Sequence, residues 1–184
     1  MHLIDVFPRE YDVQFDVPFP FWPETPRPIY YPGCRDEGGY GPVMRIEPHG
    51  GSAWTASFDG GYDSPPAISC ALSWPDPRQL CVVWLGQWSV VRTDDPKRWF
   101  EIAVYPILDV RVVPELNLIL FSDFTDIVAY GVNGEAWNCC GICKDDLRIV
   151  EVSDGTLRGT GFCMPKADCT GFEIDLRTGA LTYI

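Results

Sequence analysis

The last third of the sequence alternates short apolar stretches with glycine turns, and no other feature restricts the fold as strongly. Asn133-Gly134, Asp154-Gly155 and Thr178-Gly179 separate the stretches. Such pairs readily supply the positive φ angles that tight hairpins require. Because the stretches recur about every 8–12 residues, the pattern predicts an antiparallel meander. The expected strands are Leu118–Phe121, Ile127–Tyr130, Ala136–Cys140, Leu147–Val152, Thr156–Phe162, Gly171–Leu176 and Leu181–Tyr183.

The earlier part of the chain favours the same fold class. Tyr11–Val17 alternates strictly, Val43–Ile46 and Ala53–Phe58 do so over shorter lengths, and no segment predicts more than one turn of helix. β-branched and aromatic residues fill four further stretches. These stretches are Leu80–Leu85, Ser89–Thr93, Trp99–Tyr105 and Val110–Val113. We therefore expect an all-β fold, a single antiparallel domain built as a sandwich or an open β-meander.

An internal similarity provides the alternative, a small propeller-like sheet. Ile127–Trp137 resembles Phe172–Thr182, and both segments read as strand, turn, strand. Their offset is close to the roughly 40–45 residues of a WD-repeat blade, and the pattern is similar to blades of the WD-repeat and quinoprotein β-propellers. No third or fourth copy is visible upstream, so the sandwich or meander remains the leading expectation.

We expect one domain over residues 1–184, with residues 18–41 a Pro/Gly-rich irregular segment packed on it. Pro18–Pro32 holds six prolines and five aromatic residues. Proline at this density excludes helix and central strand and favours an extended chain. The aromatic side chains favour packing of this chain against the domain.

The segment Ile127–Thr182 also resembles a C-terminal pattern of uncharacterised bacterial all-β proteins. The resemblance depends on Trp137, Asp146–Ile149, Asp154-Gly155 and Asp175–Gly179. It implies an all-β fold and a bacterial source, and it carries no assigned activity.

The charge balance restricts the partners. The formal charge is −12, from 26 acidic and 14 basic residues. This disfavours nucleic acid, whose binding depends on phosphate neutralisation, and it disfavours an anionic membrane. A protein partner, possibly basic, is compatible with it. The N-terminal residues lack a signal-peptide pattern, so we expect a cytoplasmic protein whose cysteines are thiols or metal ligands.

The cysteines are the first candidate site. Cys139, Cys140, Cys143, Cys163 and Cys169 suggest a zinc ribbon, because Cys140 and Cys143 have knuckle spacing. The second pair is too widely spaced for a knuckle. If the strand continued to Cys143, Cys140 would face away from Cys139 and Cys143. Buried thiols are therefore the leading interpretation, with zinc or a Cys163–Cys169 disulfide as alternatives; no other cofactor is expected.

No catalytic residue can be assigned. The chain has two histidines, His2 near a terminus expected to fray and His49 in a turn, and no nucleophile motif. The paired aspartates lie at predicted turns, where Asp is favoured for backbone reasons. Trp84 and Trp88 are an even number of residues apart, so in one continuous strand they would face the same side. They are candidate contacts for a ligand or partner.

We therefore expect a non-enzymatic protein-binding β domain, possibly of immunity or inhibitor type. A carbohydrate or small-ligand-binding β module is one alternative. The other is an enzyme or zinc protein whose site assembles only in three dimensions.

Overall fold

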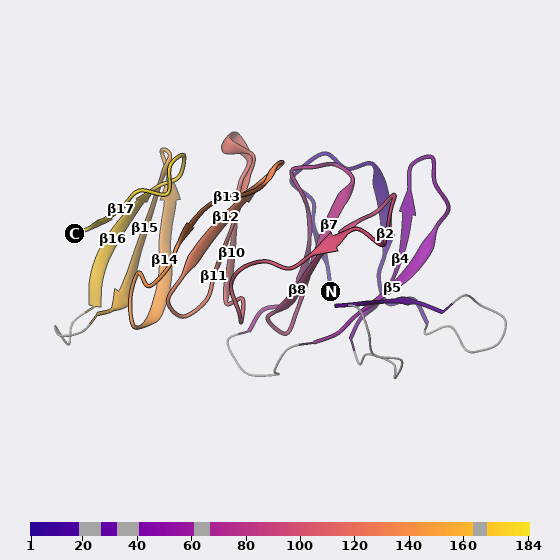
Figure 1. Ribbon diagram of the computed structural model, residues 1–184, viewed down its shortest axis with the longest axis horizontal. Coiled ribbons are helices and arrows are strands. Elements are labelled where there is room, and N and C mark those ends of the chain that lie inside the picture. The colour runs from indigo at the N-terminus through magenta and orange to yellow at the C-terminus, as the bar shows by residue number, and fades with distance from the viewer. Residues whose placement is uncertain (19–26, 33–40, 61–66, 164–168) are drawn as a thin grey trace. The chain divides into compact units, whose positions relative to one another are not determined.

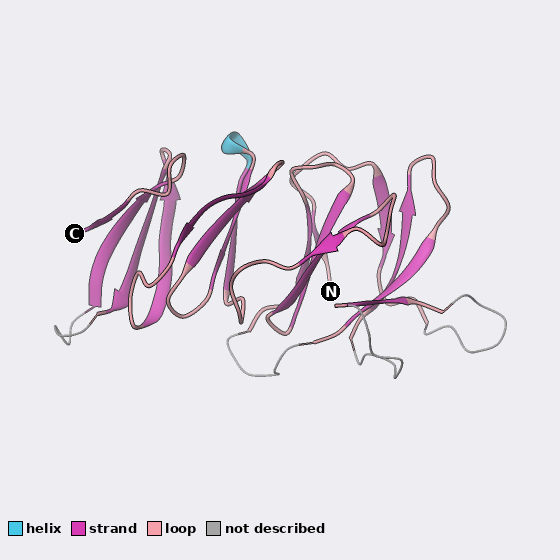
Figure 2. Ribbon diagram, in the orientation of Figure 1, coloured by secondary structure: helices cyan, strands magenta, loops and turns pink. Residues whose placement is uncertain are grey.

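The computed structural model describes residues 1–18, 27–32, 41–60, 67–163 and 169–184, with the side chains of 169 and 170 left out. The chain is all-β, with four mostly antiparallel sheets, which confirms the predicted fold class (Figures 1 and 2). The described residues contain one helical turn, a 3₁₀ turn at Pro114–Leu116, and no helix long and apolar enough to cross a membrane. Two compact units are present, Met1–Ile102 and Ala103–Ile184. The single-domain organisation stays a prediction.

The N-terminal unit contains two sheets. Their strand orders are β1-β6-β7-β8-β9 and β2-β4-β5-β3, and only the pairs β1–β6 and β3–β5 are parallel. The first sheet consists of β1 (Leu3–Ile4), β6 (Cys70–Ser73), β7 (Gln79–Trp84), β8 (Gln87–Arg92) and β9 (Trp99–Phe100). The second consists of β2 (Tyr11–Gln14), β4 (Val43–Pro48), β5 (Trp54–Phe58) and β3 (Ile29–Tyr31).

One apolar core joins these two sheets. Met44 and Ile46 alternate with exposed residues along β4 and are fully buried, as the period of a strand with one wet face requires. They pack in one cluster with Tyr11, Leu80 and Val82. Most of β7 and β8 is buried on both faces, which explains why these strands read as continuous apolar runs.

The C-terminal unit contains two four-stranded meanders in chain order, and Figure 1 shows them one after the other. Leu120, Ala129, Leu157 and Phe172 belong to one buried cluster, so the meanders share a core. The first consists of β10 (Asp109–Val113), β11 (Leu118–Ser122), β12 (Ile127–Gly131) and β13 (Gly134–Cys139). The second consists of β14 (Asp145–Ser153), β15 (Thr156–Phe162), β16 (Cys169–Asp175) and β17 (Leu181–Tyr183).

The internal similarity in the sequence corresponds to equivalent places in these meanders. β12–β13 and β16–β17 are the third and fourth strands of their respective sheets. The second hairpin also packs on the first. The indole N–H of Trp137 donates to the carbonyl of Leu176 at 2.8 Å, and Gly179 lies so close that an added Cβ would be 2.8 Å from Trp137 Cβ. Gly179 is therefore required by the close approach and by its φ of +72°.

The face of the second meander that points away from this core is polar. Arg158 on β15 forms ion pairs with Glu151 on β14 at 3.1 Å and with Glu173 on β16 at 2.8 Å. These three side chains bridge three neighbouring strands and remain partly exposed to solvent.

Several strand boundaries differ from the predictions. The strand expected over Tyr11–Val17 ends at Gln14, and that over Trp99–Tyr105 pairs only at Trp99 and Phe100. β1 and β6 were not predicted. Ala71 N–H donates to the carbonyl of His2 at 3.2 Å, so the chain start contacts β6, and the expectation that it frays stays a prediction.

Part of the irregular segment expected over residues 18–41 forms a strand. Ile29–Tyr31 pairs with β5, and Tyr31 is buried in the core of the N-terminal unit. Proline ends this strand at Pro32, as expected for a residue that cannot donate to the ladder. Residues 19–26 and 33–40 lie outside the described part of the chain.

Candidate functional site

The structure brings four of the predicted cysteines to the β13–β14 connection of the C-terminal unit. Cys139 ends β13, Cys140 and Cys143 lie in the connection, and Cys163 follows β15. Cys139 and Cys143 are buried whereas Cys140 is exposed. The apparent knuckle is thus split as predicted, although the reason given was wrong, because the strand ends at Cys139 and the chain turns at Gly141.

The described thiols do not converge on a common point. Cys139 Sγ lies 3.0 Å from the carbonyl oxygen of Gly179, and Cys143 Sγ lies 3.5 Å from that of Phe124. Cys163 Sγ lies 3.7 Å from the carbonyl oxygen of Ile142, and its thiol is free. The described residues contain no group of three potential metal ligands. Cys169 begins β16, and its side chain is outside the description, so the zinc site stays a prediction.

Burial makes the inner thiols weak acids. It raises the pKa of Cys143 to about 11 and also raises the pKa of Cys139. The thiolate is the nucleophile, so a thiol with such a pKa is a poor nucleophile at neutral pH. The geometry of these two residues agrees with buried thiols that serve as small core side chains.

The exposed side of the same connection carries aromatic and acidic side chains. Phe124, in the β11–β12 loop, and Tyr183, at the end of β17, are 43% and 52% exposed. Asp126 is the last residue of the β11–β12 loop, and Asp145 is the first residue of β14. We call these four residues the aromatic–acid surface.

Hydrogen bonds through Ile142 hold the two aromatic residues at one end of the unit. The hydroxyl of Tyr183 donates to the carbonyl of Ile142 at 2.8 Å, and the N–H of Ile142 donates to the carbonyl of Thr125 at 2.9 Å. The carbonyl of Phe124 accepts the N–H of Leu147 at 3.2 Å. The exposed rings are thus carried by backbone that is fixed between the two meanders.

The β11–β12 loop is shaped by its aspartates. Asp123 accepts the N–H groups of Thr125 and Asp126, each at 2.8 Å, and Asp126 accepts the N–H of Gly141 at 2.6 Å. These contacts agree with the backbone role predicted for turn aspartates. They also tie the β11–β12 loop to the β13–β14 connection.

The electrostatic potential at this surface is negative. Desolvation first, and then the negative charges of Asp126, Glu135 and Asp123, raise the pKa of Cys140. Desolvation disfavours any charge, but the three carboxylates disfavour a thiolate and favour a cation. Lys144 is the cation in the same stretch of chain, and the acids outnumber it.

The N-terminal unit contains a groove of about 610 Å³, which sequence reasoning missed. The β4–β5 turn at residues 49–53 forms one wall, and residues around the ends of β7 and β8 form the other. The side chains that line the groove include Glu10, His49, Trp54, Arg78 and Asp94. They come from four separate places in the sequence, so no local motif could have revealed them.

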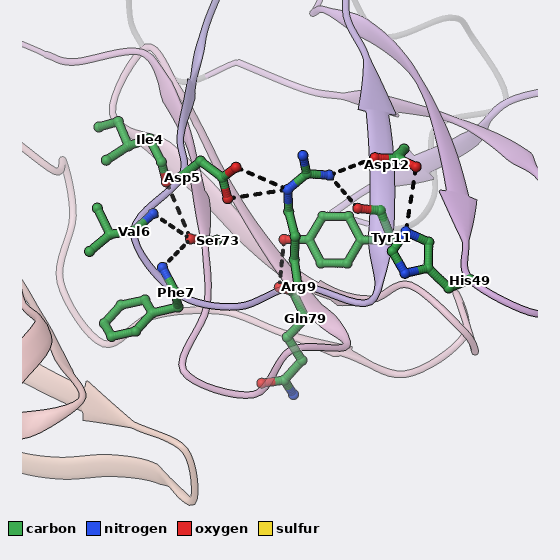
Figure 3. A network of polar contacts seen from close by, with 10 residues as sticks. All are labelled: Ile4, Asp5, Val6, Phe7, Arg9, Tyr11, Asp12, His49, Ser73 and Gln79. Carbon is green, nitrogen blue, oxygen red and sulfur yellow. Dashed lines mark hydrogen bonds and ion pairs between the residues drawn. The ribbon is translucent and has the colours of Figure 1, made fainter.

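Figure 3 shows a polar network of the N-terminal unit, and one of its residues, His49, also lines the groove. The Arg9 guanidinium lies between Asp5 at 3.2 Å and Asp12 at 2.9 Å, and His49 Nε2 lies 3.4 Å from Asp12. The hydrogen bond from Arg9 is the main reason that the pKa of Asp12 is lowered. His49, the turn histidine of the sequence, is thus placed beside carboxylates and not beside a cysteine.

Trp84 and Trp88, the predicted contact pair, do not form one platform. β7 and β8 form a hairpin in which Trp84 pairs with Gln87 and Val83 pairs with Trp88. Paired residues share a face and neighbours alternate, so the two tryptophans lie on opposite faces of the sheet. Trp88 is buried and Trp84 is half-buried. Positions 84 and 88 have the same parity, but the chain reverses at Leu85-Gly86, so equal parity does not give a shared face here.

No protein-family model and no curated protein matches the chain. Among solved structures it is similar to the N-terminal domain of Nup159, with a TM-score of 0.43 and 10% sequence identity. The alignment covers 99% of this chain and 53% of that chain, so this chain spans about half the length of its structural neighbour. A likeness at this level carries no functional argument.

Proposed function

We propose that this protein is a non-enzymatic binding domain whose aromatic–acid surface docks a basic segment of another protein. The observation that carries the proposal is the pairing of two exposed aromatic rings with acids at one fixed end of the C-terminal unit. Exposed apolar groups beside a polar, charged rim are typical of protein interaction sites.

Charge supports a basic segment as the occupant. The chain carries −12 overall, and the acids near Cys140 produce a negative local potential. Opposite charge steers association and disfavours acidic partners. Lys or Arg side chains of the partner would lie near Asp126 and Asp145, and a large apolar side chain would contact Phe124 and Tyr183.

The aromatic rings are the expected energetic centre. Interface hot spots are enriched in aromatic residues, and removal of one usually costs about 2 kcal/mol or more, which is roughly 30-fold in affinity. Acids at the edge mainly change the association rate and its salt dependence. An inhibitor or immunity protein that covers a basic partner would use this division of roles.

We also place this function in the cytoplasm. The six described cysteines for which side chains are given have free thiols, which is the usual state in a reducing compartment.

The experiment begins with a photo-crosslinking amino acid in place of Tyr183 and identification of the crosslinked partner from the natural host. The purified partner is then titrated by calorimetry with the natural protein and with Phe124→Ser, Asp126→Asn and the double variant. We expect the double variant to lose about 30-fold or more in affinity and the natural complex to weaken as salt rises.

Val150→Ser is the matched control, because Val150 is an exposed apolar residue of the same unit at 66% exposure and lies on β14 away from the surface. It should retain natural affinity. Equal affinity of the double variant and the natural protein would refute the assignment of this surface. A crosslinked partner that is acidic, or binding that strengthens with salt, would refute the charge argument.

A further inference from the structure

We propose that the groove of the N-terminal unit binds a neutral saccharide. This site is separate from the aromatic–acid surface, because all its lining residues belong to the N-terminal unit. Its volume of about 610 Å³ lies in the range of small-ligand sites.

The balance of charges in the groove favours a neutral ligand. Glu10 and Asp94 contribute two carboxylates, and Arg78 contributes a guanidinium. Asp94 is already paired with Arg92 at 2.7 Å, and Arg78 lies 3.9 Å from Asp94. A strongly anionic ligand would meet Glu10, and a strongly cationic one would meet Arg78. The charged lining residues therefore leave one net negative charge, small on a chain that carries −12 overall, and ion pairs involve Arg78 and Asp94 but not Glu10 in the described chain.

Trp54 provides a fixed aromatic wall. Its indole N–H donates to the carbonyl of Thr93 at 2.8 Å, and its ring centroid lies 6.3 Å from that of Tyr31. The ring is half-buried against the core while it also lines the groove. A held ring of this kind can pack against the C–H face of a pyranose with little loss of side-chain freedom.

The remaining groups supply both hydrogen-bond donors and acceptors. The Glu10 carboxylate has no ion pair within the described chain and can accept from sugar hydroxyls. Arg78 can donate to hydroxyl oxygens, the Nδ1 atom of neutral His49 can accept because its Nε2 faces Asp12, and the hydroxyl of Ser52 can do either. A ligand with many hydroxyl groups uses all of these groups at once, whereas an apolar ligand would leave them unpaired.

The turn beside the groove is closed by backbone hydrogen bonds, which agrees with a preformed site. Gly50 has a φ of +87°, and the N–H of Gly51 donates to the carbonyl of Pro48 at 3.1 Å. The N–H of His49 donates to the carbonyl of Glu10 at 2.8 Å, and the N–H of Glu10 donates to the carbonyl of Pro77 at 2.8 Å, so Glu10 links the β4–β5 turn to the residues before β7. Preformed sites lose less entropy on binding.

The first test uses an array of neutral and charged glycans with the full chain. The neutral glycan that binds best is then titrated while the tryptophan indole N–H signals are followed by NMR. We expect at least one neutral glycan to bind and to shift the Trp54 signal, which is identified by its absence in Trp54→Phe. Binding of no glycan on the array, or preference for charged glycans, would overturn the proposal.

The second test compares matched variants. Glu10→Gln removes the free carboxylate without changing its shape, and Trp54→Phe keeps an apolar ring in the core. Each should weaken binding by about tenfold, the usual effect of losing one charged hydrogen bond or ring contact. Glu47→Gln and Trp84→Phe are the controls, an exposed acid and a half-buried tryptophan of the same unit outside the groove. Glycan binding that both groove variants retain would assign the sugar to another surface and refute this inference.

Discussion

Gly159 gives the sharpest test of the packing in the C-terminal unit. This residue lies in the middle of β15, opposite Ile149 on one side and Phe172 on the other. A Cβ added at Gly159 would lie 2.2 Å from Phe172 Cζ and 2.7 Å from the backbone oxygen of Arg148. The Phe172 ring thus occupies the space that any side chain at position 159 would need. We expect Gly159→Ala to destabilise the protein.

The magnitude follows from two opposing effects. Forcing an extra methyl into a packed core usually costs about 1–3 kcal/mol. Replacing glycine by alanine restricts the unfolded chain and returns about 0.4–1 kcal/mol. The net loss should be about 1–2 kcal/mol, which for a chain of this size lowers the melting temperature by about 2–8 °C. Urea and thermal unfolding, followed by circular dichroism, measure it.

Gly131→Ala is the matched control in the same unit. Its added Cβ would lie 3.4 Å from Leu118 Cδ2, which is ordinary contact, so Gly131→Ala should be as stable as the natural protein or up to about 1 kcal/mol more stable. Phe172→Leu should recover part of the loss in the double variant, because it removes the clashing Cζ, with a coupling of about 0.5 kcal/mol or more. Equal stability of Gly159→Ala and Gly131→Ala would refute the claim that the Phe172 ring fills the space beside position 159.

Two further predictions concern titrating groups. At pH 8, iodoacetamide should alkylate the exposed Cys140 well before the buried Cys143, because burial raises the pKa of Cys143 to about 11. Peptide mapping measures the two alkylation rates, and equal rates would contradict the described burial. Arg9→Gln should raise the NMR titration midpoint of Asp12 toward its ordinary value of about 3.9. Because the pKa of Asp12 is lower in the folded protein than in the unfolded chain, its pairing stabilises the fold at a pH above the ordinary pKa. This stabilisation is lost as the pH falls through the folded pKa. An unchanged titration midpoint in Arg9→Gln would show that Arg9 is not the cause.

The strands that sequence reasoning located are those whose pattern is local. Gly134, Gly155 and Gly179 all have positive φ, as the hairpin turns predicted for them require. β1 could not be found because two residues contain no alternation, and its partner β6 is buried throughout. Ile102 and Val104 are buried at alternate positions but lie outside any strand. The alternation of apolar residues there reflects burial and does not correspond to strand pairing.

The candidate sites were harder to predict because they depend on long-range contacts. The cysteines were found from their spacing, yet whether they face solvent depends on where β13 ends. Phe124 and Tyr183 are far apart in the chain, and each contacts the β13–β14 connection or its neighbouring residues. Glu10 and Trp54 line one groove because β2 and β5 flank β4 in the sheet order, which no single stretch of sequence records.

The Arg158 bridge has a consequence for how such meanders can be arrayed. A further sheet stacked on that face would have to take Arg158, Glu151 and Glu173 out of water, and desolvating charges costs several kcal/mol for each ion. In arrays of repeated units, a polar outer face is what ends the stacking. The β14–β17 meander therefore has one apolar side, which is buried in the core of its unit, and one charged side, which is more stable in water than under another sheet.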